Sequence, residues 1–91
     1  MLEQFMLPMD VAMQIAVRDK EKRKKKKMTQ AALCKRAGMS LGSLKRFEQT
    51  GEISFVSLLK IADVLDEMEE FQNLFTNREY SSIQEVIDEA N

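Results

Sequence analysis

The chain has 91 residues, 44% hydrophobic and 32% charged, and this length and composition predict a single small domain with one hydrophobic core. Its formal net charge of −1 conceals an uneven distribution, because residues 1–60 hold 13 Lys and Arg against 6 Asp and Glu, whereas residues 61–91 hold 1 against 9. The lack of histidine, the single cysteine and the lack of a long apolar stretch exclude an internal disulfide and a membrane span. They leave no support for a metal site, a cofactor or an enzyme.

The charge distribution predicts two surfaces of opposite sign. The basic front part can bind a polyanion, while the acidic rear part stays away from it or binds another partner. The N-terminal segment carries Glu3 and no basic lead-in, so we expect neither a signal peptide nor an anchor. We therefore expect a cytoplasmic, nucleoid-associated protein, in which Cys34 is a small core residue rather than a redox sensor.

The first predicted helix begins at Pro8 and Asp10, because proline suits a first helical turn and aspartate can cap its free amides. An apolar stripe follows, formed by Val11, Ala12, Ile15 and Ala16. Residues 18–27 contain no apolar side chain at all, which predicts a solvated segment. This segment is either the projecting end of a helix or a basic loop.

Three later segments repeat one pattern, in which an apolar residue precedes a Ser or Thr and a second apolar residue follows five positions after the first. The pattern occurs at Met28-Thr29 with Leu33, at Met39-Ser40 with Leu44, and at Ile53-Ser54 with Leu58. In such a hydrophobic staple the hydroxyl caps the helix and the apolar pair fixes the entry of the chain. Three helices in series are predicted, the first two ending at Gly38 and near Gly51.

The remaining segments predict short helices. Asp66 and Glu69 form a capping box before an apolar face made by Met68, Phe71, Leu74 and Phe75. Ser82 and Glu85 form a second capping box that opens a C-terminal helix. The predicted fold is all-α, with five helices and a short C-terminal sixth. We expect one domain over residues 1–91, with a flexible N-terminal arm at 1–9, a core at 10–75 and a C-terminal extension at 76–91.

The segment from Thr29 to Glu48 predicts two short helices joined by a tight turn at Gly38, an arrangement that places the second helix in a groove of DNA. The segment resembles the Cro/C1-type (Xre) helix-turn-helix family through Met28-Thr29-Gln30, Leu33, Ala37-Gly38-Met39-Ser40, Leu44, Phe47-Glu48 and Gly51. The pattern from Phe55 to Phe75, with the Ser-Ser-Ile tail, also resembles the HipB-like antitoxins paired with HipA-type kinases. The resemblance implies a lambda-repressor-like DNA-binding domain.

The family resemblance also implies the contact residues. It places Gln30 at a phosphate. The residues that contact bases lie at the start of the second helix of the helix-turn-helix and one turn further along it. Leu41 offers only apolar contact to a thymine methyl, so Arg46 and Lys45 would supply most hydrogen-bonded readout. The lysine-rich stretch from Lys22 to Lys27, called the lysine run below, is favoured as a phosphate contact over a solvated helix face. The complete expected DNA-binding set is Thr29, Gln30, Ser40, Leu41, Gly42, Ser43, Lys45, Arg46, Lys25, Lys26 and Lys27.

Two further points concern the first helix. In the family Glu48 can pair with an arginine from this helix, and Arg18 and Arg23 are both candidates. Lys22 to Lys27 occupy a stretch where the family usually has an apolar residue, so we expect an insertion of about one helical turn that lifts the lysines out as an extension.

The leading functional hypothesis is a sequence-specific repressor, acting as a homodimer on a palindromic operator and serving as the autoregulating antitoxin of a toxin pair, with a possible HipA-type kinase as partner. One alternative is an interaction module that neutralises a protein partner through its acidic C-terminal face. Another is a phage-type repressor or restriction-system controller. No membrane partner is expected.

Overall fold

The computed structural model describes residues 6–76, and all regular elements in that range are α-helices. They are α1 (Pro8–Lys25), α2 (Gln30–Ala37), α3 (Leu41–Thr50), α4 (Phe55–Val64) and α5 (Met68–Gln72). The prediction of an all-α, five-helix, lambda-repressor-like domain is therefore confirmed. The expected C-terminal helix at Ser82 and Glu85 lies outside the described residues. Within residues 6–76, none of the helices has the length and apolar character needed to cross a membrane.

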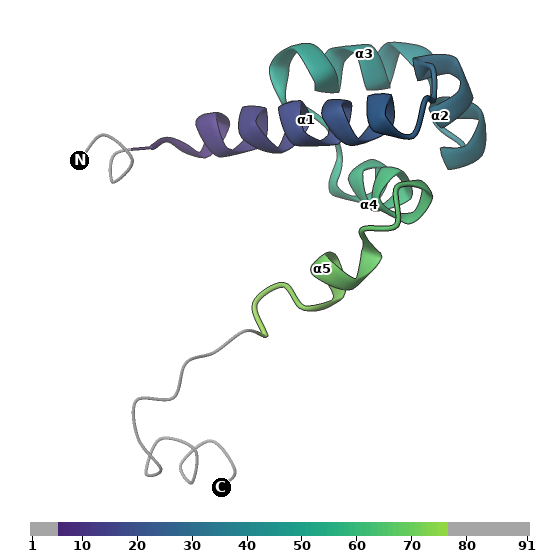
Figure 1. Ribbon diagram of the computed structural model, residues 1–91. Coiled ribbons are helices and arrows are strands. Elements are labelled where there is room, and N and C mark those ends of the chain that lie inside the picture. Colours follow the sequence, from purple (N-terminus) through teal and green to yellow (C-terminus); the bar gives the residue numbers. More distant parts are fainter. Residues whose placement is uncertain (1–5, 77–91) are drawn as a thin grey trace, which may run out of the picture.

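The long helix α1 forms the axis of the domain, with α3 above it, α4 below it and α2 near its C-terminal end (Figure 1). Contacts join α1 to α3, α2 to α3, α2 to α4, and α4 to α5. The core is enclosed by these helices and consists of Ala16, Leu33, Cys34, Leu44, Phe47, Ile61 and Leu65. Burial of this shared cluster holds the short helices together, since isolated helices of this length are marginal in water.

Side-chain caps begin the three middle helices, as the repeated staple pattern predicts. The hydroxyl oxygens of Thr29, Ser40 and Ser54 accept hydrogen bonds from the backbone N–H groups of Ala32, Ser43 and Ser57, at 3.0, 3.1 and 3.1 Å. The preceding apolar residues, Met28, Met39 and Ile53, pack against the core. Gly38 and Gly51 end α2 and α3 in the left-handed conformation, with φ of 69° and 82°.

The start of α1 differs slightly from the expectation. The Asp10 carboxylate accepts a hydrogen bond of 2.8 Å from the backbone N–H of Leu7, so Asp10 stabilises the first turn from inside the helix. The helix begins at Pro8, and residues 8 and 9 belong to it rather than to a flexible arm.

The charged stretch of α1 requires a larger correction. The helix continues unbroken to Lys25, and Asp19 and Arg23 are buried on the same face as Ala16, at 7%, 7% and 0% exposure. The expectation of a fully solvated segment is therefore wrong, whereas the one-turn insertion relative to the family stays a prediction. Charged side chains can occupy a buried stripe when polar groups of neighbouring helices meet them.

The end of the described chain also departs from the expectation. Asp66 does not cap α5, because it adopts φ of 61° and its carboxylate pairs with Lys26. Helix α5 ends at Gln72, so Leu74 and Phe75 lie beyond it, and Phe75 is 97% exposed. Phe71 packs edge-on against Phe55, with 6.4 Å between ring centroids. That contact joins α5 to the start of α4.

Candidate nucleic-acid interface

Helix α3 presents one buried and one exposed face. Leu44, Phe47 and Glu48 point into the domain. The outward residues of the expected set are all exposed, namely Leu41, Gly42, Ser43, Lys45 and Arg46, and Gln49 and Thr50 at the end of the helix are exposed as well. Gly38 joins α2 to α3 through a tight turn, which makes this pair of helices a helix-turn-helix with α3 in the position of the recognition helix.

The C-terminal end of α3 is held against α1 by a backbone contact at Gly51. A Cβ atom on Gly51 would lie 2.9 Å from the carbonyl carbon of Ala12 and 2.9 Å from the backbone nitrogen of Met13. The φ of 82° also favours glycine at this position. Gly51 therefore ends α3 and fixes how closely the recognition helix approaches α1.

A buried ion pair connects α1 to α3. The Nε and NH2 groups of Arg23 donate to the two carboxylate oxygens of Glu48, at 2.8 and 3.1 Å. The NH1 group of Arg23 donates to the carbonyl of Met28 at 2.8 Å, and the side-chain amide of Gln30 donates to Glu48 at 2.8 Å. Of the two arginines that the sequence left open, Arg23 is thus the partner of Glu48. Gln30, expected at a phosphate, is half-buried with its amide directed to Glu48.

Two further polar residues of the expected set lie at the N-terminal ends of α2 and α3. Thr29 and Ser40 are exposed and act as caps. The Ser40 hydroxyl also donates to the Ser43 hydroxyl oxygen at 2.8 Å. The partial positive charge at a helix N-terminus favours an anion such as a phosphate. These residues therefore place polar groups beside the exposed face of α3.

Arg46, the expected base reader, is an exposed residue with a protein partner. Its Nε donates to Glu52 Oε2 at 2.8 Å, and its NH2 group donates to the same oxygen. Glu52 is not among the contact residues expected from the sequence. The sequence did hold a signal for this contact, because Glu52 directly follows Gly51, the glycine predicted to end the helix and turn the chain back toward it.

The lysine run divides into paired and exposed members. Lys22 donates to Glu67 at 3.0 Å and Lys26 pairs with Asp66 at 2.9 Å. The hydrogen bond to Glu67 raises the pKa of Lys22, and the hydrogen bond from Lys26 lowers the pKa of Asp66. Lys25 and Lys27 are exposed, and neither pairs with a carboxylate within residues 6–76. Part of the basic front segment thus neutralises the acidic segment that follows α4.

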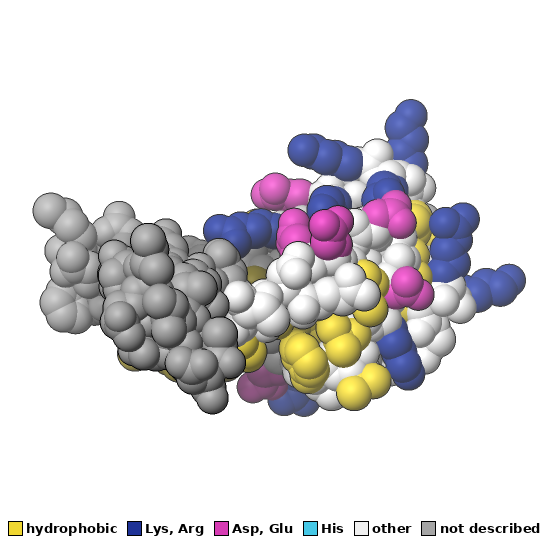
Figure 2. All heavy atoms as spheres, turned by 90° about the horizontal axis from the view of Figure 1, so that it is seen from below, with side chains coloured by type: hydrophobic (Ala, Val, Ile, Leu, Met, Phe, Trp, Pro, Cys, Tyr) yellow, Lys and Arg dark blue, Asp and Glu magenta, His cyan; other side chains and the backbone are white. Residues whose placement is uncertain are grey.

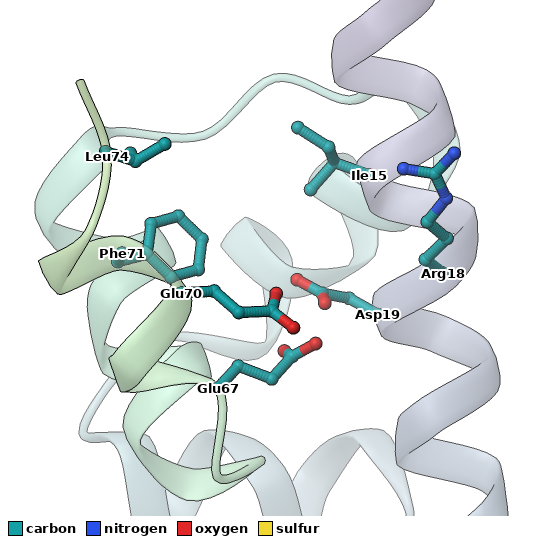
Figure 3. Close-up of a pocket in the computed structure, with 7 residues that line it drawn as sticks. All are labelled: Ile15, Arg18, Asp19, Glu67, Glu70, Phe71 and Leu74. Carbon is teal, nitrogen blue, oxygen red and sulfur yellow. The ribbon is translucent and has the colours of Figure 1, made fainter. Parts of the chain in front are cut away.

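A second polar cluster lies between α1 and α5, where the carboxyl groups of Asp19 and Glu67 point toward each other (Figure 3). Burial, the hydrogen bond with Glu67 and the charge of Glu67 raise the pKa of Asp19 to about 7. Glu67 Oε1 is buried, and within residues 6–76 it has no hydrogen-bond partner while Asp19 is ionised. The adjoining pocket is lined by Ile15, Arg18, Asp19, Glu67, Glu70, Phe71 and Leu74. None of these residues belongs to the expected DNA-binding set.

Cys34 is a core residue, as predicted. Its thiol is buried and its sulfur lies 3.5 Å from the carbonyl oxygen of Ser40. Burial raises the pKa of this thiol. Both features reduce its reactivity. Residues 6–76 contain no group of three or more metal-ligating side chains.

The capped helix pair, the turn at Gly38 and the exposed face of α3 define a helix-turn-helix protein, a class that binds DNA. Residues 20–71 match the helix-turn-helix family, so the chain belongs to that family. The expected Cro/C1-type (Xre) resemblance is thereby supported, and the chain is a DNA-binding helix-turn-helix protein of a regulatory, typically non-enzymatic kind. No curated protein and no solved structure gives a significant match.

Proposed function

We propose that the chain is a sequence-specific transcriptional repressor that inserts α3 into the major groove of a palindromic operator. The observation that carries the proposal is the exposed face of α3, where Ser43, Lys45 and Arg46 project beside two capped helix N-termini. Leu41 and Gly42 offer no side-chain hydrogen bonds to bases, so Arg46 and Lys45 supply most of the direct readout. Lys25 and Lys27 add phosphate contacts from the end of α1.

The proposed assembly is a homodimer whose two α3 helices read half-sites about 34 Å apart. In the proposed setting the chain represses its own promoter, as the antitoxin of a toxin pair does. A small repressor needs a second copy because one recognition helix contacts only a few base pairs.

A fluorescence-anisotropy titration tests the proposal. The duplex is the region upstream of the chain's own gene, compared with a scrambled duplex of equal length over a range of salt concentrations. We expect tighter binding to the upstream duplex, with two chains per duplex. Equal affinity for both duplexes at every salt concentration would contradict the proposal.

A variant with Lys45→Gln and Arg46→Gln removes charge from the exposed face of α3 without touching the core. We expect it to lose binding to the upstream duplex while keeping the wild-type circular dichroism spectrum. Lys60→Gln is the matched control, since Lys60 is exposed on α4, below α1 in Figure 1 while α3 lies above. Loss of binding in the control as well would show that total charge, rather than the face of α3, governs binding.

A second candidate function is the capture of a protein partner by the face formed by α4, α5 and residues 73–76. Figure 2 shows hydrophobic side chains gathered on the underside of the molecule beside acidic ones, with lysines and arginines projecting at the rim. The exposed hydrophobic residues of this part of the chain are Phe55, Val56, Leu74 and Phe75, at 58, 62, 43 and 97%. Large apolar groups left in water favour a protein contact. A HipA-type kinase toxin is the partner we propose.

Affinity purification of the chain from its native host, followed by mass spectrometry, tests this candidate. We expect one stoichiometric partner that is lost when Phe55 and Val56 are both replaced by serine. Recovery of the chain alone would rule out the partner role. Retention of the partner by the double variant would place its contact elsewhere.

A further inference from the structure

Arg46 and Glu52 lie on either side of the turn that ends α3. Both side chains are accessible, with 69 and 48% of their surface exposed. Two groups of the guanidinium, Nε and NH2, donate to the same oxygen of Glu52. Within residues 6–76, the third group, NH1, donates to no protein acceptor. The arginine is therefore held on one edge and free on the other.

The backbone that carries Glu52 is itself fixed. Gly51 adopts the left-handed conformation and lies against the backbone of α1, which leaves no space for a side chain. The Thr50 hydroxyl donates to the Arg46 carbonyl at 2.7 Å and accepts from the Glu52 N–H at 3.1 Å. These contacts bring the chain back toward the outward face of α3. The approach of Glu52 to Arg46 thus follows from local backbone structure as well as from the attraction of two surface charges.

We propose that Glu52 is a specificity-determining residue that positions Arg46 for base readout. The inference rests on the proposed repressor function. A carboxylate on the Nε side restricts rotation of the guanidinium, so less conformational entropy is lost when the free edge donates to guanine. The same carboxylate repels phosphate oxygens and offsets part of the positive potential around Arg46. It thereby discourages the sequence-independent phosphate contact that a free arginine would make.

Arg46 gains importance from the residues around it. Leu41 and Gly42 cannot donate hydrogen bonds from their side chains, and Ser43 is short and already paired with Ser40. Direct discrimination by α3 therefore depends mainly on Arg46 and Lys45, and of these two only Arg46 is held by a carboxylate within residues 6–76. Control of that one guanidinium changes which bases the whole helix prefers.

The variant Glu52→Gln tests the proposal in the intact chain, because it keeps the size of the side chain and removes its charge. Duplexes selected from a library randomised over the operator are sequenced for wild type and variant, and anisotropy gives the affinities for operator and scrambled duplexes. We expect the guanine preference at one position of each half-site to weaken and the ratio of operator to scrambled affinity to fall about tenfold. Scrambled-duplex binding should depend more steeply on salt, by about one additional phosphate contact.

Three variants complete the test. Glu69→Gln removes an exposed carboxylate from α5 and should leave the base preference unchanged. Glu52→Asp retains the charge and should restore part of the preference. In an Arg46→Ala background, Glu52→Gln should no longer alter the base preference at that position. Thermal melts that match wild type establish that Glu52→Gln leaves the fold intact.

Two outcomes would overturn the proposal, and they differ from each other. If the wild-type chain does not distinguish its operator from scrambled DNA, the repressor function fails, and Glu52 has no specificity to determine. If the wild type discriminates and Glu52→Gln changes both affinities by the same factor, the repressor function stands. Glu52 then acts only through its general charge.

Discussion

Arg23 and Glu48, which are 25 residues apart in the chain, form a buried two-point ion pair that joins the last turn of α1 to the last turn of α3. Their side chains are only 8 and 4% exposed. The same pair reaches the carbonyl of Met28 and the amide of Gln30, so the start of α2 is attached to it as well. All three helices that position the DNA-binding face therefore meet at one charged group.

Removal of one partner from this pair should destabilise the domain by about 3–5 kcal/mol, because the remaining charge is buried without compensation. We expect this loss in urea unfolding for Arg23→Met and for Glu48→Leu. The double variant should be much more stable than the sum of the two losses implies, since neither charge remains. If the two losses simply add, the residues are not energetically coupled.

The pair of Asp19 and Glu67 predicts an unusual dependence of stability on pH. The folded chain raises the pKa of Asp19 to about 7, whereas an unfolded aspartate has a pKa of about 3.9. Between these values the folded state holds a proton that the unfolded state has released. The contribution of this group to the free energy of unfolding is therefore fully present below pH 4 and falls as the pH rises to 7.

Asp19→Asn should remove this dependence. The asparagine amide can donate to Glu67 Oε1 at every pH, whereas an ionised Asp19 cannot, so we expect a gain of about 1–3 kcal/mol at pH 8. The other charged groups facing this site, Lys22 and Glu70, remain unchanged. Urea unfolding from pH 4 to 8 measures the effect, with Asp63→Asn on the exposed surface of α4 as control. Parallel pH profiles for wild type and Asp19→Asn would refute the assignment.

Two glycines allow the stability cost of the close approach between α1 and α3 to be distinguished from the cost of a positive φ. Gly38 and Gly51 both have positive φ, but among residues 6–76 an added Cβ meets no atom within 4 Å at Gly38, whereas it meets backbone atoms at 2.9 Å at Gly51. Gly38→Ala should cost about 1–2 kcal/mol from conformation alone. Gly51→Ala should cost clearly more, because α1 and α3 must also move apart. Equal costs in thermal or urea unfolding would mean that the close approach contributes nothing.

The lysine run should contribute to DNA binding according to which lysines are already paired. Lys25→Gln and Lys27→Gln should each reduce the slope of log affinity against log salt by about 0.9, if each lysine contacts one phosphate. Lys26→Gln should reduce it less, because Lys26 must first leave Asp66. Anisotropy titrations at several salt concentrations measure the slopes, with Lys60→Gln as control. Equal slopes for wild type and all lysine variants would identify the run as a solvated helix face.

Sequence patterns predicted the parts of this fold that depend on local interactions. The caps at Thr29, Ser40 and Ser54, and the helix ends at Gly38 and Gly51, involve residues close together in the chain. Asp66 was predicted to cap α5 by the same rule, but its carboxylate is bound to Lys26, 40 residues earlier. A cap pattern cannot reveal such a distant competitor.

The polar interior of the domain was harder to predict. Periodicity of apolar residues gives no signal for Asp19 or Arg23, since both are charged and occur in a stretch without apolar side chains. The family resemblance identified Glu48 and two possible arginines, and only the crossing of α1 and α3 selects Arg23. The Arg46–Glu52 contact likewise depends on the direction in which the chain leaves Gly51.

The close approach at Gly51 has a consequence for how this domain can change. Gly51 packs against the backbone of α1. The spacing between α1 and α3 is therefore set by main-chain atoms and does not depend on the side chains that α3 presents to DNA. The outward residues of α3 can therefore be exchanged as a set while Leu44, Phe47 and Glu48 are retained. Substitution of these outward residues can change the operator preference while the fold is kept. A set of substitutions that includes position 52 also changes the carboxylate that positions the side chain of residue 46.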